Sequence, residues 1–348
     1  MSTMKALVYT GIGKVEQLDR PKPTIQDPTD AVVRLLHASI CGTDLHILKG
    51  DVPTAQPGLI LGHEGVGVIE SVGATVQGLS VGDQVLISCV TSCGACQFCQ
   101  RGLPSHCTTG SWILGNKIDG TQAEYVRVPH ASLSLHRLPA SINLRAALAL
   151  SDSLPTALEC GVLSANVQPG SSVVIIGAGP VGMAALLTAQ LYSPSLIVMA
   201  DLDESRLATA KKLGANATIK SSASDTREQL LALTNGYGFD SVIEAVGIPA
   251  TFDLCQDLVA VGGRIANVGV HGVPVQLHLE KLWDRNISIH MSLVNATTTQ
   301  RLLRLLNADK LDISSLVTHH FPFSQGLEAY TTFRAAADHQ ALKVAIDF

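Results

Sequence analysis

The spacing of apolar and polar residues changes about halfway along the chain. Up to about residue 150, short β-branched runs alternate with Gly, Pro and other turn residues. These runs cover residues 31–36, 65–72, 84–88 and 123–128. Short apolar runs separated by frequent turn signals are typical of an irregular, mostly antiparallel β domain, which we expect over residues 1–153.

From about residue 170 the pattern alternates between buried strands and helices. The predicted strands cover residues 172–177, 195–201, 217–220, 239–247, 264–270 and 287–293, and the predicted helices cover 181–191, 204–213, 226–233 and 250–259. This alternation predicts an α/β domain of the Rossmann type, a doubly wound parallel sheet, over residues 154–290. The tail, residues 291–348, contains one clear helix at 299–307. It forms either a third piece or a return into the first domain.

The composition limits the classes of protein that fit. A length of 348 residues suits about two domains, and 46% hydrophobic with 15% charged residues excludes a disordered chain. The net charge is −5 and Lys and Arg form no cluster, so we expect no nucleic-acid partner.

Residues 160–200 contain no charged residue and exceed the length that a membrane-spanning helix needs. Gly and Pro interrupt this run at several points, which favours a buried strand, turn, helix and second strand over a membrane span. The first eleven residues lack the apolar core and cleavage site of a signal peptide. We therefore expect a cytoplasmic protein with no membrane partner.

A Gly-rich turn directly follows the first predicted strand of the second domain. Its residues are Gly177, Ala178, Gly179, Pro180, Val181 and Gly182. Between a strand and a helix, this G-x-G-x-x-G pattern permits a tight turn and close approach of the backbone to a pyrophosphate. The next strand ends in Asp201, 24 residues after Gly177, where a carboxylate can accept hydrogen bonds from an adenosine ribose. We predict a dinucleotide site, with Arg206 either along the same ribose or on a solvated helix face.

Four of the eight cysteines lie within 15 residues: Cys93, Cys96, Cys99 and Cys107. Four thiolates at short spacing suit tetrahedral zinc, and a closed set of ligands indicates a structural site. The alternative is an iron–sulfur cluster. In the ferredoxin pattern three residues separate the third cysteine from the fourth, whereas seven residues separate Cys99 from Cys107 here. The sequence favours a structural zinc lobe over about residues 89–110, with His106 as an alternative ligand.

Two further segments carry metal-binding residue types. They are Cys41-Gly42-Thr43-Asp44-Leu45-His46 and Gly62-His63-Glu64. Together with the four-cysteine lobe and the Gly-rich turn, they follow the order of the zinc-containing medium-chain dehydrogenase/reductase family of alcohol dehydrogenases, which the chain resembles over essentially all 348 residues. The resemblance implies a GroES-like first domain, a return of the tail into it, two zinc ions per chain and NAD(H).

By this resemblance, Cys41 and His63 bind a catalytic zinc. The third ligand in the family is often a cysteine, but this chain has Asp152 in the corresponding segment, as in the branch that resembles bacterial secondary-alcohol dehydrogenases. A thiolate and a carboxylate carry the same total charge as two thiolates, so the zinc dication is still neutralised. Cys160 ranks below Asp152 as the third ligand.

The resemblance also assigns roles around this metal. Glu64 either approaches the metal or forms a hydrogen bond nearby, and we expect Asp44 to orient His63. Thr43 and His46 match the positions of a relay that carries the alcohol proton to solvent. The substrate-pocket candidates are Thr43, Cys89, Val90, Trp112, Leu293 and Val294. The further cofactor contacts are Val246, Val268 and Val270.

These observations predict an NAD-dependent zinc alcohol dehydrogenase that acts on secondary, and also primary, alcohols and on ketones or aldehydes. The resemblance implies that it is a homotetramer. The acids Asp201, Asp203 and Glu204 favour NAD over NADP. One alternative is the same chemistry on a polyol, a diol or an amino alcohol, as in sorbitol, butanediol or threonine dehydrogenases. The other is a nucleotide-binding relative without catalysis.

Overall fold

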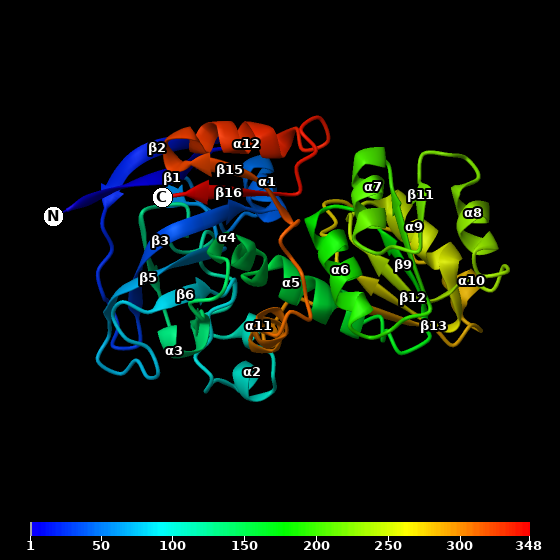
Figure 1. Ribbon diagram of the computed structural model, residues 1–348, viewed down its shortest axis with the longest axis horizontal. Coiled ribbons are helices and arrows are strands. Elements are labelled where there is room, and N and C mark those ends of the chain that lie inside the picture. Colours follow the sequence, from blue (N-terminus) through cyan, green and yellow to red (C-terminus); the bar gives the residue numbers. More distant parts are fainter. Residues whose placement is uncertain (1) are drawn as a thin grey trace. The chain divides into compact units, whose positions relative to one another are not determined.

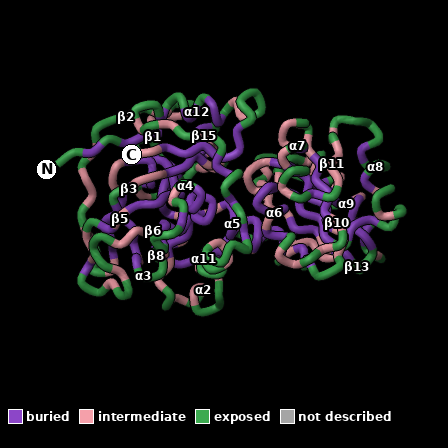
Figure 2. Tube along the Cα trace, in the orientation of Figure 1, coloured by how far each residue is buried: buried purple, intermediate pink, exposed green. Residues whose placement is uncertain are grey.

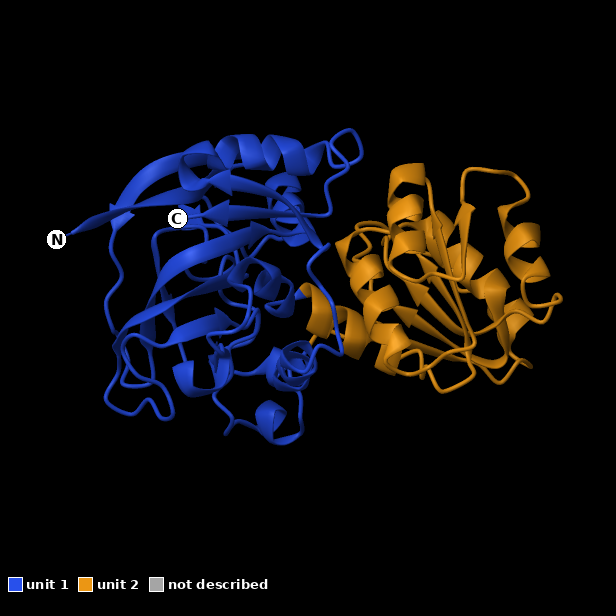
Figure 3. Cartoon of the chain, in the orientation of Figure 1, with its two compact units in different colours: residues 1–152, 295–348 blue, residues 153–294 orange. Residues whose placement is uncertain are grey.

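The computed structural model describes residues 2–348, which form two compact units (Figure 3). Unit 1 combines the residues up to Asp152 with residues 295–348, and unit 2 consists of residues 153–294. The sequence placed these boundaries after residues 153 and 290. The chain thus leaves unit 1 once and returns to it for its last segment.

Unit 1 contains two sheets, which are mostly antiparallel. The strand order is β2-β1-β4 in the smaller sheet and β15-β16-β3-β5-β6-β8 in the larger one, where β7 also pairs with β3 (Figure 1). The strands are β1 Thr3–Gly11, β2 Lys14–Pro21, β3 Ala31–Ile40, β4 Leu59–Ile60, β5 Gly65–Val72, β6 Gln84–Ile87, β7 Tyr125–Val128, β8 Leu135–Arg137, β15 Val317–Pro322 and β16 Lys343–Asp347. The returning segment therefore supplies β16 next to β3, inside the larger sheet.

Short helices connect these strands. They are α1 Gly42–Lys49, α2 Gln97–Gln100, α3 Ala131–Ser134, α4 Leu144–Ala147, α11 Thr299–Asn307 and α12 Gly326–Arg334, with 3₁₀ turns at Pro104–His106, Leu148–Leu150 and Phe323–Gln325. The α11 helix has the bounds predicted from the sequence.

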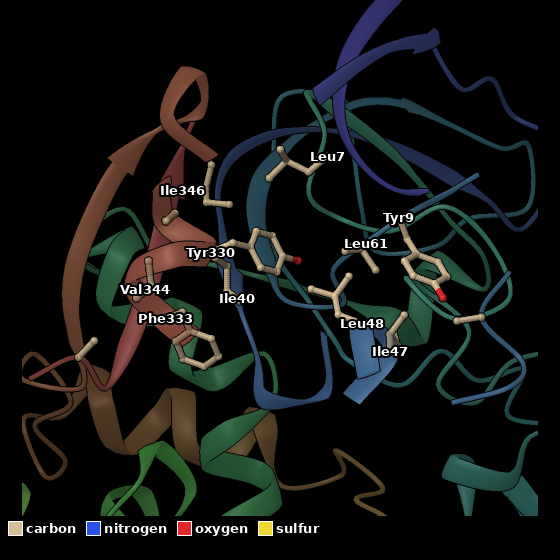
Figure 4. Packing of buried hydrophobic residues seen from close by; sticks show 13 residues of the cluster. Leu7, Tyr9, Ile40, Ile47, Leu48, Leu61, Tyr330, Phe333, Val344 and Ile346 are labelled. Atoms are coloured by element: carbon tan, nitrogen blue, oxygen red, sulfur yellow. The ribbon is translucent and has the colours of Figure 1, made fainter. Parts of the chain in front are cut away.

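One apolar core of unit 1 joins distant parts of the chain. Figure 4 shows Ile40 at the end of β3 and Leu61 after β4 among side chains of the returning segment, including Tyr330 and Phe333 of α12 and Val344 of β16. All of these side chains are at least nine-tenths buried. Burial of this apolar surface stabilises the position of the last segment against the first part of the unit.

Unit 2 is a six-stranded parallel sheet in the order β11-β10-β9-β12-β13-β14. Its strands are β9 Ser172–Ile176, β10 Leu196–Asp201, β11 Ala217–Lys220, β12 Phe239–Glu244, β13 Val259–Asn267 and β14 Ser288–Met291. Its helices are α5 Ser153–Thr156, the π-helical segment η3 Ala157–Leu163, α6 Pro180–Gln190, α7 Glu204–Lys212, α8 Thr226–Ala232, α9 Pro249–Leu258 and α10 Leu279–Leu282. The strand order reverses between β9 and β12, which makes this the predicted doubly wound Rossmann sheet.

The apolar pattern of β9 and β10 explains the uncharged run at residues 160–200. Figure 2 shows the strands of this sheet largely in the buried colour, and the interior residues of β9 and β10 are buried. The run forms the predicted strand, turn, helix and strand. A different run, residues 144–163, is long and apolar enough to cross a membrane, but 78% of its most apolar window is buried inside the protein, as in a core helix.

The bounds predicted for β12 and β13 were wrong. β12 ends at Glu244 rather than at 247, and β13 covers Val259–Asn267 rather than 264–270. The N–H groups of Val268 and Gly269 bond to the backbone oxygen of Glu244, so residues 268–270 form a turn beyond the strand. The apolar residues after Glu244 and Asn267 belong to turns, although the sequence pattern assigned them to the strands.

Candidate functional site

Four potential metal ligands converge in unit 1 from separate segments. One ligand atom each from Cys41, His63, Glu64 and Asp152 lies within 4.8 Å of all the others. Cys41 follows β3 and precedes α1, the pair at 63–64 precedes β5, and Asp152 follows the 3₁₀ turn Leu148–Leu150. The sulfur of Cys41 is 3.6 Å from Oδ2 of Asp152, and Nε2 of His63 is 3.5 Å from the same oxygen.

The chemistry of these donors fits zinc. Sulfur, imidazole nitrogen and carboxylate oxygen are the three ligand types that zinc binds, and three protein ligands leave a position for substrate. Burial raises the pKa of the Cys41 thiol, and the Glu64 carboxylate adds to this effect. Burial alone would lower the pKa of His63, but its hydrogen bonds to Asp152 and Cys41 raise it well above its ordinary value. A dication at this position would favour the thiolate and the neutral imidazole that binding requires. The group does not include Cys160, which lies in η3 of unit 2.

No hydrogen bond joins His63 to the Asp44 side chain, which we expected to orient it. Nδ1 of His63 and Oδ1 of Asp44 are both buried without a hydrogen-bond partner. Oδ2 of Asp44 instead accepts from the backbone N–H of Cys41 (2.9 Å) and from Nε2 of Gln122 (3.0 Å), and Oε1 of Gln122 accepts from the Tyr330 hydroxyl (2.7 Å). Burial raises the pKa of Asp44 to about 6. Asp44 caps the first turn of α1 and thereby fixes the backbone of Cys41.

Glu64 has a buried counter-ion that the sequence analysis missed. Lys343 of β16 bonds to both carboxylate oxygens, with Nζ 2.6 Å from Oε1, and the hydroxyl of Ser39 donates to Oε2. The side chains of Lys343 and Glu64 are 3% and 0% exposed. Because 279 positions separate the two residues, no local pattern could have paired them.

Thr43 and Trp112, predicted for the relay and the pocket, lie beside these ligands, and His46 follows Thr43 on α1. Oγ1 of Thr43 is 3.7 Å from the sulfur of Cys41, and Nδ1 of His46 is 2.9 Å from a carboxylate oxygen of Asp51. The ring of Trp112 meets that of His63 edge to face at 6.0 Å.

The other pocket candidates divide between the units. Cys89 and Val90 are buried in unit 1, and the N–H of Cys89 donates to the backbone oxygen of Ser151, one residue before Asp152. Leu293 and Val294 belong to unit 2, where Leu293 is exposed and Val294 is buried.

The four-cysteine lobe forms a second metal group in unit 1. Ligand atoms of Cys93, Cys96, Cys99 and Cys107 lie within 4.8 Å of one another. Backbone N–H groups point at the sulfurs, for example Cys96 N–H at Sγ of Cys93 (3.3 Å). The N–H groups of Cys99 and Thr108 lower the pKa of Cys96 to about 5. Such donors favour thiolates, so this closed set fits a structural zinc without His106.

The Gly-rich turn of unit 2 joins β9 to α6. Gly177 has φ +104°, and a Cβ on Gly182 would lie 1.9 Å from the backbone oxygen of Gly177, so only glycine fits at both positions. Oδ2 of Asp201, at the end of β10, accepts from the N–H of Ala178 at 2.6 Å. Nη1 of Arg206 lies 3.9 Å from the Cβ position of Gly179. The carboxylate, the guanidinium and the turn thus meet at the carboxyl edge of the sheet. Pro180 and Val181, both partly exposed, open the helix beside them.

The remaining predicted cofactor residues lie in two turns beyond β12 and β13. Val246 and Val270 are 43% and 64% exposed, and Val268 is half-buried. Large exposed apolar side chains at this edge are consistent with a surface that a ligand covers.

Comparison with known proteins agrees with this geometry. Residues 27–140 match the model of the alcohol dehydrogenase GroES-like domain, and residues 180–308 match that of zinc-binding dehydrogenases. An alcohol dehydrogenase of Cupriavidus necator is 33% identical over 99% of this chain and 98% of its own length. A sorbitol dehydrogenase of Halalkalibacterium halodurans is 32% identical over 99% of this chain and 100% of its own length.

Among solved structures, the apo form of zinc dependent alcohol dehydrogenase 2 from Streptococcus pneumonia superposes with a TM-score of 0.95 at 50% identity, covering 99% of this chain and 98% of its own. The matches and the two metal groups indicate an alcohol dehydrogenase that uses zinc and a nicotinamide cofactor. The chain belongs to the zinc-containing medium-chain dehydrogenase/reductase family of alcohol dehydrogenases.

Proposed function

We propose that the protein is an NAD-dependent zinc dehydrogenase that interconverts small secondary alcohols and ketones, and primary alcohols and aldehydes less readily. The observation that carries this proposal is the convergence of Cys41, His63 and Asp152 with Glu64 at one position. Zinc bound there supplies a Lewis acid that favours the alkoxide, and NAD supplies the hydride acceptor.

Glu64 differs from the other three candidates in its partners. Lys343 bonds to both of its oxygens and Ser39 to one of them. We therefore assign Cys41, His63 and Asp152 as the permanent ligands and leave the fourth position to substrate. The thiolate of Cys41 and the carboxylate of Asp152 together carry two negative charges, which neutralise the zinc dication. The negative charge of Glu64 is neutralised separately by the ammonium group of Lys343.

Thr43 and His46 carry the proton away in this proposal. The Thr43 hydroxyl lies beside Cys41, and His46 lies on the same helix, partly exposed and bonded to Asp51. A hydroxyl near the metal can accept the alcohol proton while it passes its own to the next group. The partly exposed imidazole then releases a proton to solvent.

The side chains near the metal favour apolar substrates. Trp112 packs against His63. Cys89 and Val90 are buried, and the N–H of Cys89 bonds to the backbone oxygen of Ser151, one residue before Asp152. An apolar wall binds an aliphatic or aryl group better than the hydroxyl groups of a sugar, because those would lose their hydrogen bonds to water. The sorbitol dehydrogenase relative makes a polyol the second candidate.

We propose NAD rather than NADP because Asp201 ends β10. A ribose 2′-phosphate at that carboxylate would bring roughly two negative charges against it, and Asp203 and Glu204 follow directly. NAD should be favoured by at least about tenfold in kcat/KM. Replacement of Asp201 by Gly, with Arg in place of Leu202, should narrow or invert this preference.

We further propose a cytoplasmic homotetramer. Unit 2 exposes large apolar side chains near its edge strand β14, including Leu279 (62%), Trp283 (79%) and Met291 (71%). Exposed apolar groups of this size beside an unpaired strand edge are typical of surfaces that another protein covers. Light scattering of the purified protein measures the mass.

The decisive experiment is a substrate panel with zinc analysis. NADH absorbance is followed with secondary and primary alcohols, diols, polyols and threonine, and with NADP in place of NAD. We expect two zinc ions per chain and the highest kcat/KM with secondary alcohols and NAD. A preference for sorbitol would support the polyol candidate, and two zinc ions without turnover of any substrate would support a non-catalytic relative.

A further inference from the structure

The carboxyl edge of unit 2 contains a buried carboxylate that the proposed reaction does not use. Glu244 is the last residue of β12, and its side chain is 0% exposed. Oε1 accepts from the N–H groups of Val246 (3.0 Å) and Gly247 (2.9 Å) and from the Thr251 hydroxyl (2.7 Å), and Oε2 accepts from Gly247 (3.2 Å). All four contacts are donated to the carboxyl group, which is the pattern of an ionised carboxylate.

No amine or guanidinium of residues 2–348 forms an ion pair with this carboxylate. Its nearest basic group is His271, whose Nε2 lies 3.8 Å from Oε2. That Nε2 bonds to Oδ1 of Asn267 at 2.9 Å, and Nδ2 of Asn267 donates to the backbone oxygen of Gly269. The amide orientation of Asn267 is thereby fixed, and Nε2 of His271 is the protonated nitrogen.

The other ring nitrogen of His271 has no acceptor for a second proton. Nδ1 is buried without a hydrogen-bond partner. A proton on Nδ1 would be a buried donor with nothing to accept it, which is costly. The bare nitrogen is therefore the stable form, and the charge of Glu244 stays uncompensated.

Glu244 lies beneath two interlocked turns. The Cβ position of Gly269 is 2.3 Å from Oε2 of Glu244, and the Cβ position of Gly247 is 2.4 Å from the backbone oxygen of Val270. These turns bear Val246 and Val270, the exposed apolar residues at this edge. No side chain fits between the turns and the Glu244 carboxylate. The electric field of the carboxylate therefore acts on any ligand that covers the two turns.

The topology indicates which part of the cofactor covers these turns. A doubly wound sheet consists of two mononucleotide-binding halves on either side of the point where the strand order reverses. The Gly-rich turn after β9 and Asp201 at the end of β10 occupy the half that takes the adenosine. The other half, β12 to β14, is left for the nicotinamide nucleotide.

We infer that the buried Glu244 carboxylate is a specificity-determining group for the redox state of the cofactor, and that it favours NAD⁺ over NADH. The inference rests on the proposed function. The two forms differ in charge only at the nicotinamide ring, which is a cation in NAD⁺ and neutral in NADH. A fixed negative charge close to the ring therefore stabilises bound NAD⁺ and leaves bound NADH nearly unaffected. Charges about 10 Å apart at an effective dielectric constant of about 30 change the ratio of dissociation constants about sixfold.

The test compares the dissociation constants of NADH, from its fluorescence, and of NAD⁺, from competition, in zinc-loaded protein. In Glu244→Gln we expect the ratio Kd(NAD⁺)/Kd(NADH) to rise about sixfold. Asp240→Asn is the matched control, because Asp240 is an exposed acid at the opposite end of the same strand, and the ratio should stay constant. A Glu244→Gln protein that loses affinity for both forms equally would overturn the inference and show a purely structural role.

A second variant tests the charge without touching the buried network. Ile248 is 46% exposed at the end of the first turn. A lysine there opposes the field of Glu244, so Ile248→Lys should raise the same ratio, whereas Ile248→Gln should not. An unchanged ratio in Ile248→Lys would contradict the inference even if Glu244→Gln does not fold. If the wild-type protein binds neither NAD⁺ nor NADH, the proposed function itself is wrong and this inference falls with it.

Discussion

Replacement of Lys343 by Met should destabilise unit 1 strongly. The change removes the only cation that forms an ion pair with Glu64 among residues 2–348 and leaves a carboxylate at 0% exposure. The Ser39 hydroxyl remains as a donor, but one hydroxyl does not replace an ammonium group that touches both oxygens. Met has nearly the length of the lysine stem, so the packing of β16 is largely kept and the loss is electrostatic.

The structure sets the size of this effect. Breaking a fully buried ion pair by removal of one partner costs about 3–5 kcal/mol. A domain of about 200 residues loses roughly 2–4 °C in Tm per kcal/mol, so the transition of unit 1 should fall by about 10 °C. The same substitution at Lys5 is the control, because its 2.9 Å pair with Asp19 has both side chains more than half exposed. That exposed pair should contribute less than about 1 kcal/mol.

Thermal unfolding by circular dichroism, with zinc in excess for every variant, measures both changes. The double variant Lys343→Met with Glu64→Gln removes both charges and should recover most of the lost stability, because no buried charge remains. A Lys343→Met protein that melts within about 2 °C of the wild type would refute the reasoning. So would a double variant that is no more stable than Lys343→Met alone.

The metal groups and two titratable or hydroxyl side chains give further predictions. Cys96→Ser should lose about one zinc and melt at a lower temperature, because metal binding at a closed site contributes to folding; metal analysis and calorimetry measure both changes. Asp152→Ala should stay folded with about one zinc and lose turnover, as measured by metal analysis and NADH absorbance. Full activity of Asp152→Ala would contradict the ligand assignment. Thr43→Ala should lower kcat at least about a hundredfold with the zinc content unchanged, and a wild-type rate would exclude the relay. Burial lowers the pKa of His136 to about 4, below that of the unfolded chain, so the unfolded state takes up the proton first. Stability should therefore fall as the pH drops from about 6.5 to 4, by up to about 3 kcal/mol, and His136→Gln should flatten that part of a denaturant-midpoint profile against pH.

Local spacing predicted the parts of the molecule that local geometry determines. The Gly-rich turn needs glycine where φ is positive or a helix approaches a strand, and such positions are visible in the sequence as Gly177 and Gly182. The four cysteines lie in one short loop, so their spacing already limits the distances between their sulfurs. Both the β-rich first half and the alternating second half appeared as expected.

Long-range partners were not predictable in this way. The contact between Lys343 and Glu64 depends on where the returning segment enters the sheet, which no short-range pattern encodes. The expected bond from Asp44 to His63 is not formed, although Oδ1 of Asp44 and Nδ1 of His63 are both without a partner. The bonds that Asp44 does form, to the N–H of Cys41 and to the Gln122 amide, depend on the tertiary structure and on the cap of α1. The ends of β12 and β13 were misplaced because apolar residues continue into turns whose glycines bring the backbones together.

The division of unit 1 into two segments also orders events during synthesis. Unit 2 is continuous, so it can fold on the ribosome as soon as residues 153–294 have emerged. Unit 1 cannot finish until β16, which ends at Asp347, has taken its place beside β3. Until then β3 lacks a neighbour along its inner edge and Glu64 lacks its counter-ion. While unit 2 is synthesised, the larger sheet of unit 1 is incomplete and one edge of β3 is exposed. A chaperone that binds exposed strand edges should therefore contact the nascent chain during this interval.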